Sequence, residues 1–161
     1  EMKEIILLLD GLRDGVYQFI ILPFASEEPE CCCFPFETEQ LYFSLPPAHP
    51  LAGEKGLRFA DIDGETILLL SQIGFWREVC RQKMPLSRAL VQTEQADYQE
   101  LVQASALPSF VSDLAMRWMG RPENRVVIPI LDPEASAVYH FLCKKESRRK
   151  LSALIQRLRQ G

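Results

Sequence analysis

The sequence predicts an α/β fold built from two lobes. Short apolar runs that suit β-strands alternate with segments of about ten residues that suit helices, and this alternation is typical of sheets connected by helical crossovers. Two such groups of elements occur, and proline-rich connections near residues 46–64 and 129–136 join them. We therefore expect mixed, mostly parallel sheets flanked by helices, with a chain that passes between the lobes twice.

The helices are predicted from apolar periodicity and from end signals. Residues 1–14 repeat apolar side chains at helical spacing, and Gly15 follows them as a C-terminal cap. Pro85 ends the helix expected over residues 74–84, which opens near Ser71. Asp97 is the expected N-cap of the next helix. The complete set of expected helices is 1–14, 59–63, 74–84, 97–105, 112–119 and 146–160.

The strands are predicted from runs of β-branched and other apolar residues. Residues 16–22 (VYQFIIL) are almost wholly apolar, which is typical of a strand buried on both faces. Residues 31–36 and 39–45 are expected as two strands around a turn. Residues 46–52 hold three prolines, so they cannot form a regular element. The other expected strands are 66–70, 88–93, 106–111 (a short strand or turn), 125–130 and 137–144.

The composition argues against several classes of protein. With 161 residues, 47% hydrophobic and 25% charged, the chain suits an ordinary globular protein. Its net charge of -4 does not predict a nucleic-acid-binding face. No run reaches the roughly 18 apolar residues of a membrane span, and the charged start does not resemble a secretory signal. We expect a cytoplasmic protein without membrane association, whose five cysteines are reduced.

Neither a metal site nor an active site is expected. His49 and His140 are the two histidines. Cys143 follows His140 by three residues, and side chains at that spacing on a strand point to opposite faces. The sequence contains no Gly-x-Ser-x-Gly motif, no P-loop and no glycine-rich dinucleotide turn. We therefore expect no catalytic residues, no metal ligands and no cofactor.

Three segments resemble LysR-type transcription regulators. Residues 41–52 (LYFSLPPAHPLA) resemble the family segment in which a strand runs into a His-Pro-Leu-Ala motif. Residues 9–21 resemble the family's helix and L-x-x-G-x-x-D-x-x-I strand, with Gln18 where the family usually has Asp. Residues 100–108 resemble its V-x-x-G-x-G-I-x-x-L-P turn, although the glycines are replaced. The matches follow the family's order over almost the whole chain.

The resemblance implies an effector-binding domain with a two-lobed fold like that of type 2 periplasmic binding proteins. Lobe I would comprise residues 1–64 and 137–161, and lobe II residues 65–136. The family's DNA-binding winged helix-turn-helix, and the first strand and helix of lobe I, have no counterpart in this sequence. Lobe I is therefore expected to be incomplete, with its open sheet edge covered by dimerisation or by a chain segment outside this sequence. DNA would be contacted only through the missing domain.

The resemblance places a small effector, anionic or aromatic, in the cleft between the lobes. Helix starts beside strand ends favour a carboxylate, whereas Glu94 and Asp97 leave a neutral or cationic effector open. Helix capping is the alternative role for Ser71 and Asp97, and core packing for Phe24 and Phe75. The residues expected to contact the effector are Phe24, Ser44, Ser71, Gln72, Gly74, Phe75, Gln95, Ala96 and Asp97.

Sensing domains of this family pair side by side, which implies a homodimer or tetramer. The corresponding faces lie in residues 1–14 and 112–119, although internal packing is the alternative for these side chains. The expected interface residues are Ile5, Leu8, Leu12, Met116 and Met119.

Two other functions stay open, namely a solute-binding protein of a transporter and a thiol-based redox sensor. In peroxide-sensing relatives the reactive cysteine falls near Phe75 of this chain. Cys80 lies deeper in its helix and is expected to be a buried small hydrophobe.

Overall fold

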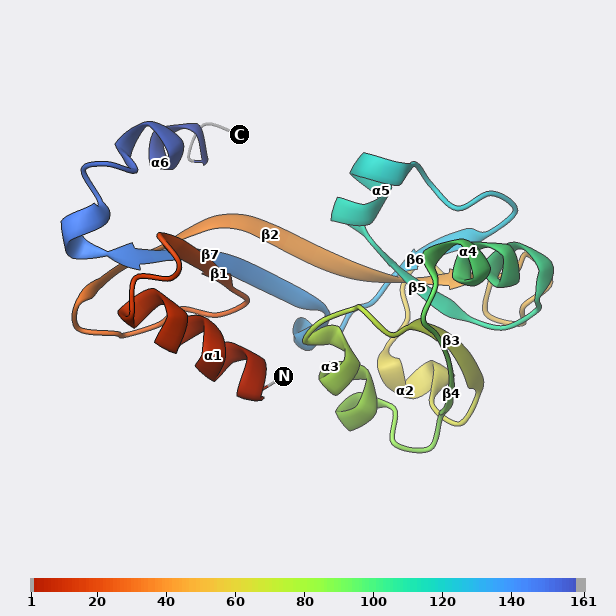
Figure 1. The fold of residues 1–161 in the computed structure, drawn as a ribbon. Helices are drawn as coiled ribbons and strands as arrows, with labels where there is room; N and C mark the ends of the chain where they lie inside the picture. The colour runs from red at the N-terminus through yellow and green to blue at the C-terminus, as the bar shows by residue number, and fades with distance from the viewer. Residues whose placement is uncertain (1, 159–161) are drawn as a thin grey trace. The chain divides into compact units, whose positions relative to one another are not determined.

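The computed structural model describes the backbone of residues 2–158 and the side chains of residues 5–157. The chain divides into two compact units. Unit 1 comprises the described residues up to Thr38 and from Ala137 onward, and unit 2 comprises Glu39–Ser136. Figure 1 labels their helices and strands. The chain passes between the units twice, within the long strand β2 (Cys31–Leu45) and at the start of β7 (Ser136–Lys144).

Unit 1 is a small sheet with a helix packed against each face. Strand β1 (Phe19–Leu22) pairs antiparallel with β7, which is also a neighbour of β2. Helix α1 (Met2–Arg13) packs on one face over a cluster of Leu12, Ile20, Leu22 and Leu142. A short 3₁₀ helix (Lys145–Ser147) and α6 (Ser152–Leu158) follow β7. The cluster on the second face contains Phe141, Cys143, Leu151 and Ile155.

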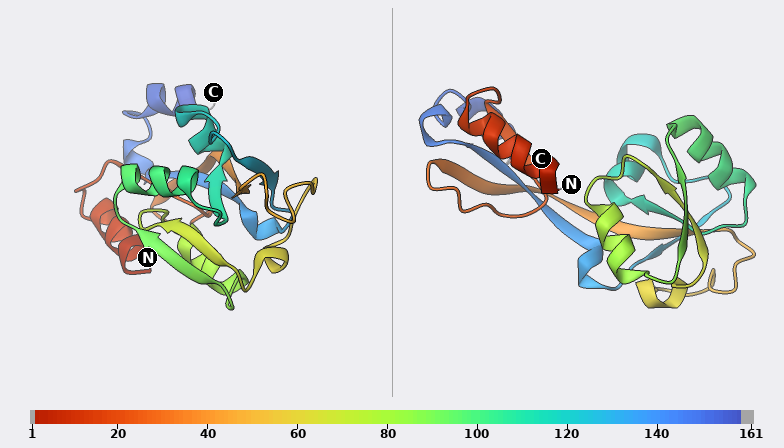
Figure 2. Two further views of the ribbon diagram at one scale, coloured as in Figure 1. Left: turned by 90° about the vertical axis from the view of Figure 1, so that its right-hand side faces the viewer. Right: turned by 60° about the horizontal axis from the view of Figure 1, so that its bottom comes forward.

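Unit 2 is a mixed sheet with the strand order β6-β2-β5-β3-β4. Strand β3 pairs in parallel with β4 and β5, whereas β2 pairs antiparallel with β5 and β6. Figure 2 shows the helices around these strands. The strands are β3 (Thr66–Leu70), β4 (Arg88–Gln92), β5 (Ser109–Ser112) and β6 (Val126–Pro129). The helices are α2 (Phe59–Ile62), α3 (Trp76–Lys83), α4 (Gln95–Ala104), α5 (Asp113–Met119) and a 3₁₀ turn, Pro133–Ala135.

The prediction of two strands around a turn at residues 31–36 and 39–45 is wrong, because Cys31–Leu45 is one strand of 15 residues. Its first part lies beside β7 and its last part between β5 and β6. Backbone partners at both ends keep the polar middle extended. Because the last part of β2 pairs with strands of unit 2, residues 39–64 belong to unit 2, whereas the sequence analysis placed them in lobe I.

The strand expected over residues 16–22 is shorter and is buried on one face only. In β1, Ile20 and Leu22 are buried under α1, whereas Phe19 and Ile21 are exposed. The physical reason is its position at the end of the strand order, where a helix covers one face fully. Among residues 2–158, β7 is the one strand that pairs with β1, and the cover that the sequence analysis expected from a second copy or from outside this sequence stays a prediction.

Two helix starts also differ from the prediction. Glu94, rather than Asp97, is the N-cap of α4, since its backbone is extended and helical geometry begins at Gln95. Helix α3 begins at Trp76 rather than near Ser71, because Gly74 turns the chain with a φ of 57°. The expected helix 146–160 begins with the 3₁₀ turn and becomes α-helical only at Ser152, and its last residues lie outside the described part.

His49 explains the compact turn after β2. The backbone N–H of Leu51 donates to His49 Nδ1 at 3.2 Å, so Nδ1 is the acceptor nitrogen of the ring. The other nitrogen, Nε2, therefore carries the proton and donates to Glu65 Oε2 at 3.0 Å. This buried ring ties the proline-rich connection to the start of β3. Among residues 2–158, no helix has the length and apolar character needed to cross a membrane.

An aromatic cluster at Phe43 anchors the core of unit 2, and we predict that Phe43→Ala destabilises the fold by about 3–5 kcal/mol. The Phe43 ring is fully buried and lies 6.1 Å from the Phe59 ring and 5.1 Å from the Phe110 ring. Urea denaturation followed by circular dichroism measures the loss. Leu86→Ala is the control, since Leu86 is 77% exposed, and equal losses in both variants would contradict the prediction.

Candidate functional site

The carboxyl ends of β3 and β4 bring together two predicted effector-binding segments. Leu70 and Gln92 are partners in the parallel ladder, and the Ser71 N–H donates to the Gln92 carbonyl at 2.7 Å. The segments that follow, residues 71–76 and 93–97, therefore begin side by side. We call them the β3–β4 edge. They contain all the predicted effector-binding residues except Phe24 and Ser44.

The β3–β4 edge is accessible and has an uncapped helix start. Gln72, Gly74, Gln95, Ala96 and Asp97 are exposed, and Ser71 and Phe75 are half-buried. The N-cap residue Glu94 makes no side-chain hydrogen bond to the first turn of α4. Backbone N–H groups at such a start can donate to an anion. The negative charge of Asp97 in the same turn favours the helix but competes with an anionic ligand.

Trp76 at the end of the first segment pairs with Glu39 of β2, and the sequence analysis did not select either residue. Trp76 is buried, and its Nε1 donates to Glu39 Oε2 at 2.8 Å. The Phe75 ring lies beside the Trp76 ring in a tilted arrangement, with the ring centroids 4.3 Å apart. A buried tryptophan needs an acceptor for its N–H, but the sequence could not indicate which of the 22 acidic residues supplies it.

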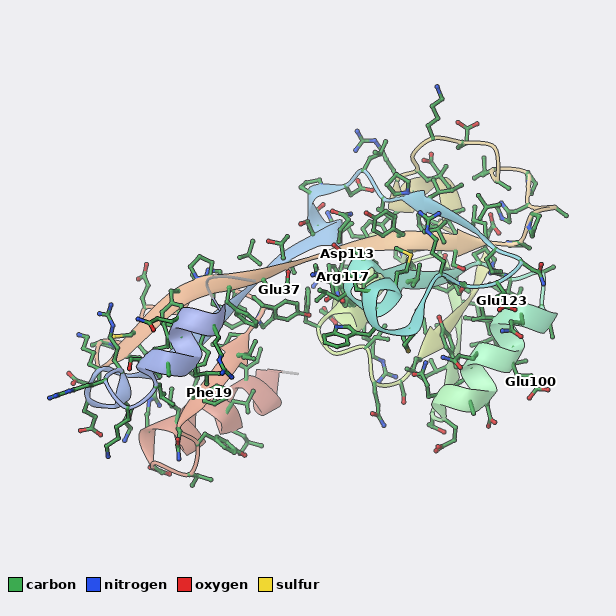
Figure 3. The ribbon with its side chains drawn as sticks, turned by 90° about the horizontal axis from the view of Figure 1, so that it is seen from above. Phe19, Glu37, Glu100, Asp113, Arg117 and Glu123 are labelled. Carbon is green, nitrogen blue, oxygen red and sulfur yellow. The ribbon has the colours of Figure 1, made fainter. Side chains whose placement is uncertain are left out.

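The start of α5 lies at the same end of the sheet. The Gln40 N–H donates to Asp113 Oδ1 at 2.9 Å, and the Ser112 hydroxyl accepts from the Ala115 N–H at 3.1 Å. Ser112 is thus the N-cap of α5. Figure 3 shows Asp113 and Arg117 on successive turns of this helix. This end of the sheet therefore carries charged side chains of both signs.

Ser44 lies away from the β3–β4 edge. It is 1% exposed, and its partners in the antiparallel ladders are Ser109 and Val127, near the starts of β5 and β6. Because β2 runs antiparallel to β5, residues late in β2 lie at the end of the sheet opposite the carboxyl ends of β3 and β5. The structure thus separates Ser44 from the other predicted residues of unit 2.

Arg125 holds this opposite end together. Its Nη2 donates to the Ser44 carbonyl at 2.6 Å and to the Leu107 carbonyl at 2.5 Å, and its Nη1 donates to the Ser105 carbonyl at 3.1 Å. Its Nε lies 3.3 Å from the Ser44 hydroxyl. Burial lowers the pKa of the Arg125 guanidinium. The sequence analysis missed Arg125, which satisfies the carbonyls of the turn where the family's glycines are replaced.

Phe24 and the predicted dimer residues differ in how far their side chains are exposed. Phe24 belongs to unit 1 and is 43% exposed. Leu12 is 1% exposed and lies in the core under α1, so its side chain does not present an interface. Ile5 and Leu8 are half-buried against that core. On α5, Met116 is half-buried and Met119 is 61% exposed.

Burial favours the protonated thiol at Cys31, Cys80 and Cys143. Cys80 is buried, and burial raises its pKa to about 12. Burial is also the main reason for the raised pKa of Cys143 and of Cys31. Within residues 2–158, no group of three or more His, Cys, Asp or Glu side chains is arranged to hold a metal ion.

Arg125→Lys is expected to cost about 1–3 kcal/mol, because one ammonium cannot reach all the carbonyls that the guanidinium binds and leaves buried acceptors unsatisfied. Thermal or urea unfolding measures the loss. Arg121→Lys is the matched control, since Arg121 is exposed. A loss of the same size at both positions would contradict the role assigned to Arg125.

Cys80 is expected to resist iodoacetamide in the folded protein. With a pKa of about 12, a thiolate fraction on the order of one in ten thousand exists at pH 8. Folding raises this pKa above its ordinary value of 9.0, so the folded state loses stability as the pH rises above 9.0. Mass spectrometry of alkylated peptides, with and without urea, tests the protection. Rapid labelling of Cys80 without urea would contradict it.

Comparisons with known proteins agree with this architecture. The family model described as the LysR substrate binding domain matches residues 4–161. The reduced form of the OxyR regulatory domain from Pseudomonas aeruginosa superposes with a TM-score of 0.74 at 19% identity, covering 96% of this chain and 78% of that one. The regulatory domain of MetR (NMB2055), a LysR family regulator from N. meningitidis, gives a TM-score of 0.74 at 14% identity, covering 94% and 73%.

A third similar structure is the effector binding domain of QuiR in complex with shikimate. It has a TM-score of 0.59 at 15% identity and covers 86% of this chain and 68% of that one. No curated relative matches the sequence. At these identities the structural likeness shows a shared fold. Because the family model covers almost the whole sequence, the chain belongs to the LysR substrate binding domain family, the effector-sensing domains of LysR-type transcription regulators.

Proposed function

We propose that the effector of this sensing domain binds at the β3–β4 edge of unit 2. The observation that carries the proposal is the Ser71–Gln92 backbone hydrogen bond, which aligns the ends of two neighbouring parallel strands. Ligands of open α/β sheets bind where the carboxyl ends of strands meet the starts of helices. Phe75 adds an apolar wall, and the exposed first turn of α4 adds backbone donors.

A small carboxylic acid is the effector class that we favour. The first turn of α4 offers free N–H groups at the positive end of a helix dipole. The QuiR domain, which shares the fold, was solved with shikimate, a carboxylic acid. Glu94 and Asp97 beside this turn support a neutral or cationic effector as the alternative.

Effector binding would act by population shift. An effector that binds one conformation of the protein more tightly than another shifts the equilibrium between the two conformations, and the shift is set by the difference between the two affinities. In this proposal the protein works in the cytoplasm as a homodimer or tetramer, and it contacts DNA through a separate domain. It binds its effector without chemical conversion.

The thiol-based alternative has less support. Residues 71–76 and 93–97 contain no cysteine, and Phe75 stands near the place where the resemblance puts the reactive thiol. The buried Cys80 has a raised pKa, whereas peroxide reacts with accessible thiolates. For the solute-binding alternative, a secretory signal encoded upstream of residue 1 would be the supporting observation.

A thermal-shift screen against small acids tests the proposal. We expect at least one member of a panel of shikimate, benzoate and amino acids to raise the melting temperature, because a ligand that binds only the folded state stabilises it. Chloride at equal ionic strength is the control. The site proposal fails if a stabilising acid leaves the NMR signals of residues 71–76 and 93–97 unchanged.

Gln95→Pro tests the contribution of the helix start. Proline removes one backbone donor at the first position of α4, where its fixed φ is compatible with the extended Glu94. We expect it to weaken binding of the stabilising acid by about tenfold or more, the effect of losing one hydrogen bond to a charged group. Gln95→Ala keeps the N–H and is the matched control. Equal effects in both variants, measured by calorimetry, would contradict the role of the backbone donor.

A further inference from the structure

The start of β2 and the end of β7 are neighbours in unit 1, and the arrows in Figure 1 show that the two strands run in opposite directions. The backbone N–H of Lys145, just after β7, donates to the carbonyl of Glu30, just before β2, at 2.9 Å. Glu30 is therefore opposite Lys145, because opposite residues of an antiparallel pair are joined by such bonds. Two residues further along β2 is Cys32, and two residues back along β7 is Cys143. This register places Cys32 directly opposite Cys143.

The packing of side chains agrees with this register. Two residues beyond the cysteines, Phe34 of β2 and Phe141 of β7 have stacked rings with their centroids 5.2 Å apart. Residues directly opposite each other share a face of the sheet. Accordingly, Cys32 and Phe34 both pack against the cluster that contains Cys143, Phe141 and Ile155 of α6. The thiols of Cys32 and Cys143 are therefore neighbours on the face that α6 covers.

The spacing of these two thiols suits one metal ion with two ligands. The Cβ atoms of directly opposite residues are roughly 4.5–5.5 Å apart. A metal–thiolate bond is about 2.3 Å long, so a linear sulfur–metal–sulfur bridge spans roughly 4.6 Å. Cys31 and Cys33, by contrast, pack on the face under α1. They are two residues apart on one strand, which separates their Cα atoms by roughly 6.5 Å.

We propose that Cys32 and Cys143 form a two-thiolate site for a soft monovalent cation of the Cu(I) class. Thiolate sulfur is a soft ligand that selects Cu(I), zinc or iron–sulfur clusters. Structural zinc sites and iron–sulfur clusters are held by four ligands. Within residues 2–158, no third His, Cys, Asp or Glu side chain joins these two thiols in a group that could hold a metal ion. A linear complex is therefore the one that this pair of thiols completes without further ligands.

The charges around the pair favour such a complex. A monovalent cation replaces the two thiol protons, which are released to solvent, so the complex carries a single negative charge. Burial raises the pKa of the Cys143 thiol, and negative charge at Cys32 raises it further. The Arg148 guanidinium acts in the opposite direction. A cation between the two sulfurs removes the repulsion between the thiolates, and Arg148 stabilises the remaining negative charge.

The site combines an apolar interior with a route to solvent. Cys143 is fully buried in a cluster with Phe141, Leu151 and Ile155, and these side chains offer no competing ligand. Cys32 is half-buried, so an ion can reach the pair from its side. The site belongs to unit 1, whereas the β3–β4 edge belongs to unit 2. This proposal therefore does not rest on the proposed effector site.

An anaerobic titration of the fully reduced 161-residue chain with Cu(I), in competition with a Cu(I) chelator, tests the site. We expect one tightly bound ion for each chain. Cys32→Ser should weaken the binding by more than about a hundredfold, because the loss of groups that merely support a ligand already costs up to about that factor. Cys33→Ser is the matched control, since Cys33 is also half-buried on β2 but packs on the other face. It should leave the affinity for Cu(I) unchanged.

Cys143→Ala removes the second ligand and should weaken the binding as strongly as Cys32→Ser, with circular dichroism to compare the folding of the variants. X-ray absorption of the copper-loaded chain provides the structural readout, and we expect two sulfur neighbours without nitrogen or oxygen. Three or more sulfur neighbours would overturn the proposal. So would a reduced wild-type chain that takes no Cu(I) from the chelator, or equal weakening of the binding by Cys32→Ser and Cys33→Ser.

Discussion

The continuous pairing of β2 is the constraint on which the arrangement of unit 2 depends. Its residues Leu41–Leu45 lie between β5 and β6, so hydrogen bonds on both sides fix the register. Strand β5 in turn positions β3 through the Leu68–Ser109 pair, and β3 positions β4. A slip of β2 by one residue would turn Phe43 out of the core. The location of the β3–β4 edge thus follows from the register of a strand that contributes Glu39 to it.

Side-chain hydrogen bonds hold the backbone of two irregular connections in place. The turn at residues 105–108 lacks glycine, and Arg125 binds two of its carbonyls together with that of Ser44. The proline-rich connection after β2 is held by His49, whose two ring nitrogens are both engaged. Both side chains bridge residues from separate elements. Arg125 and His49 therefore stabilise the ends of strands rather than the interior of the sheet.

The family fold tolerates almost complete replacement of its sequence, since OxyR and MetR domains superpose at 14–19% identity. What distinguishes one sensing domain from another therefore lies in exposed side chains at positions that the shared backbone supplies. In this chain the β3–β4 edge carries Phe75, a buried tryptophan paired with Glu39, and carboxylates beside the start of α4.

The sequence by itself determined the elements that local patterns encode. Apolar runs and proline or glycine stops predicted the strand Thr66–Leu70 with its observed bounds and the neighbouring helices to within a few residues, because periodicity depends on residues close in the chain. The tertiary structure decided the rest: the unbroken β2, the one-sided burial of β1 and the Arg125 contacts with Ser44, 81 positions away. Such features arise from pairing between distant segments, and no local pattern specifies which segments meet.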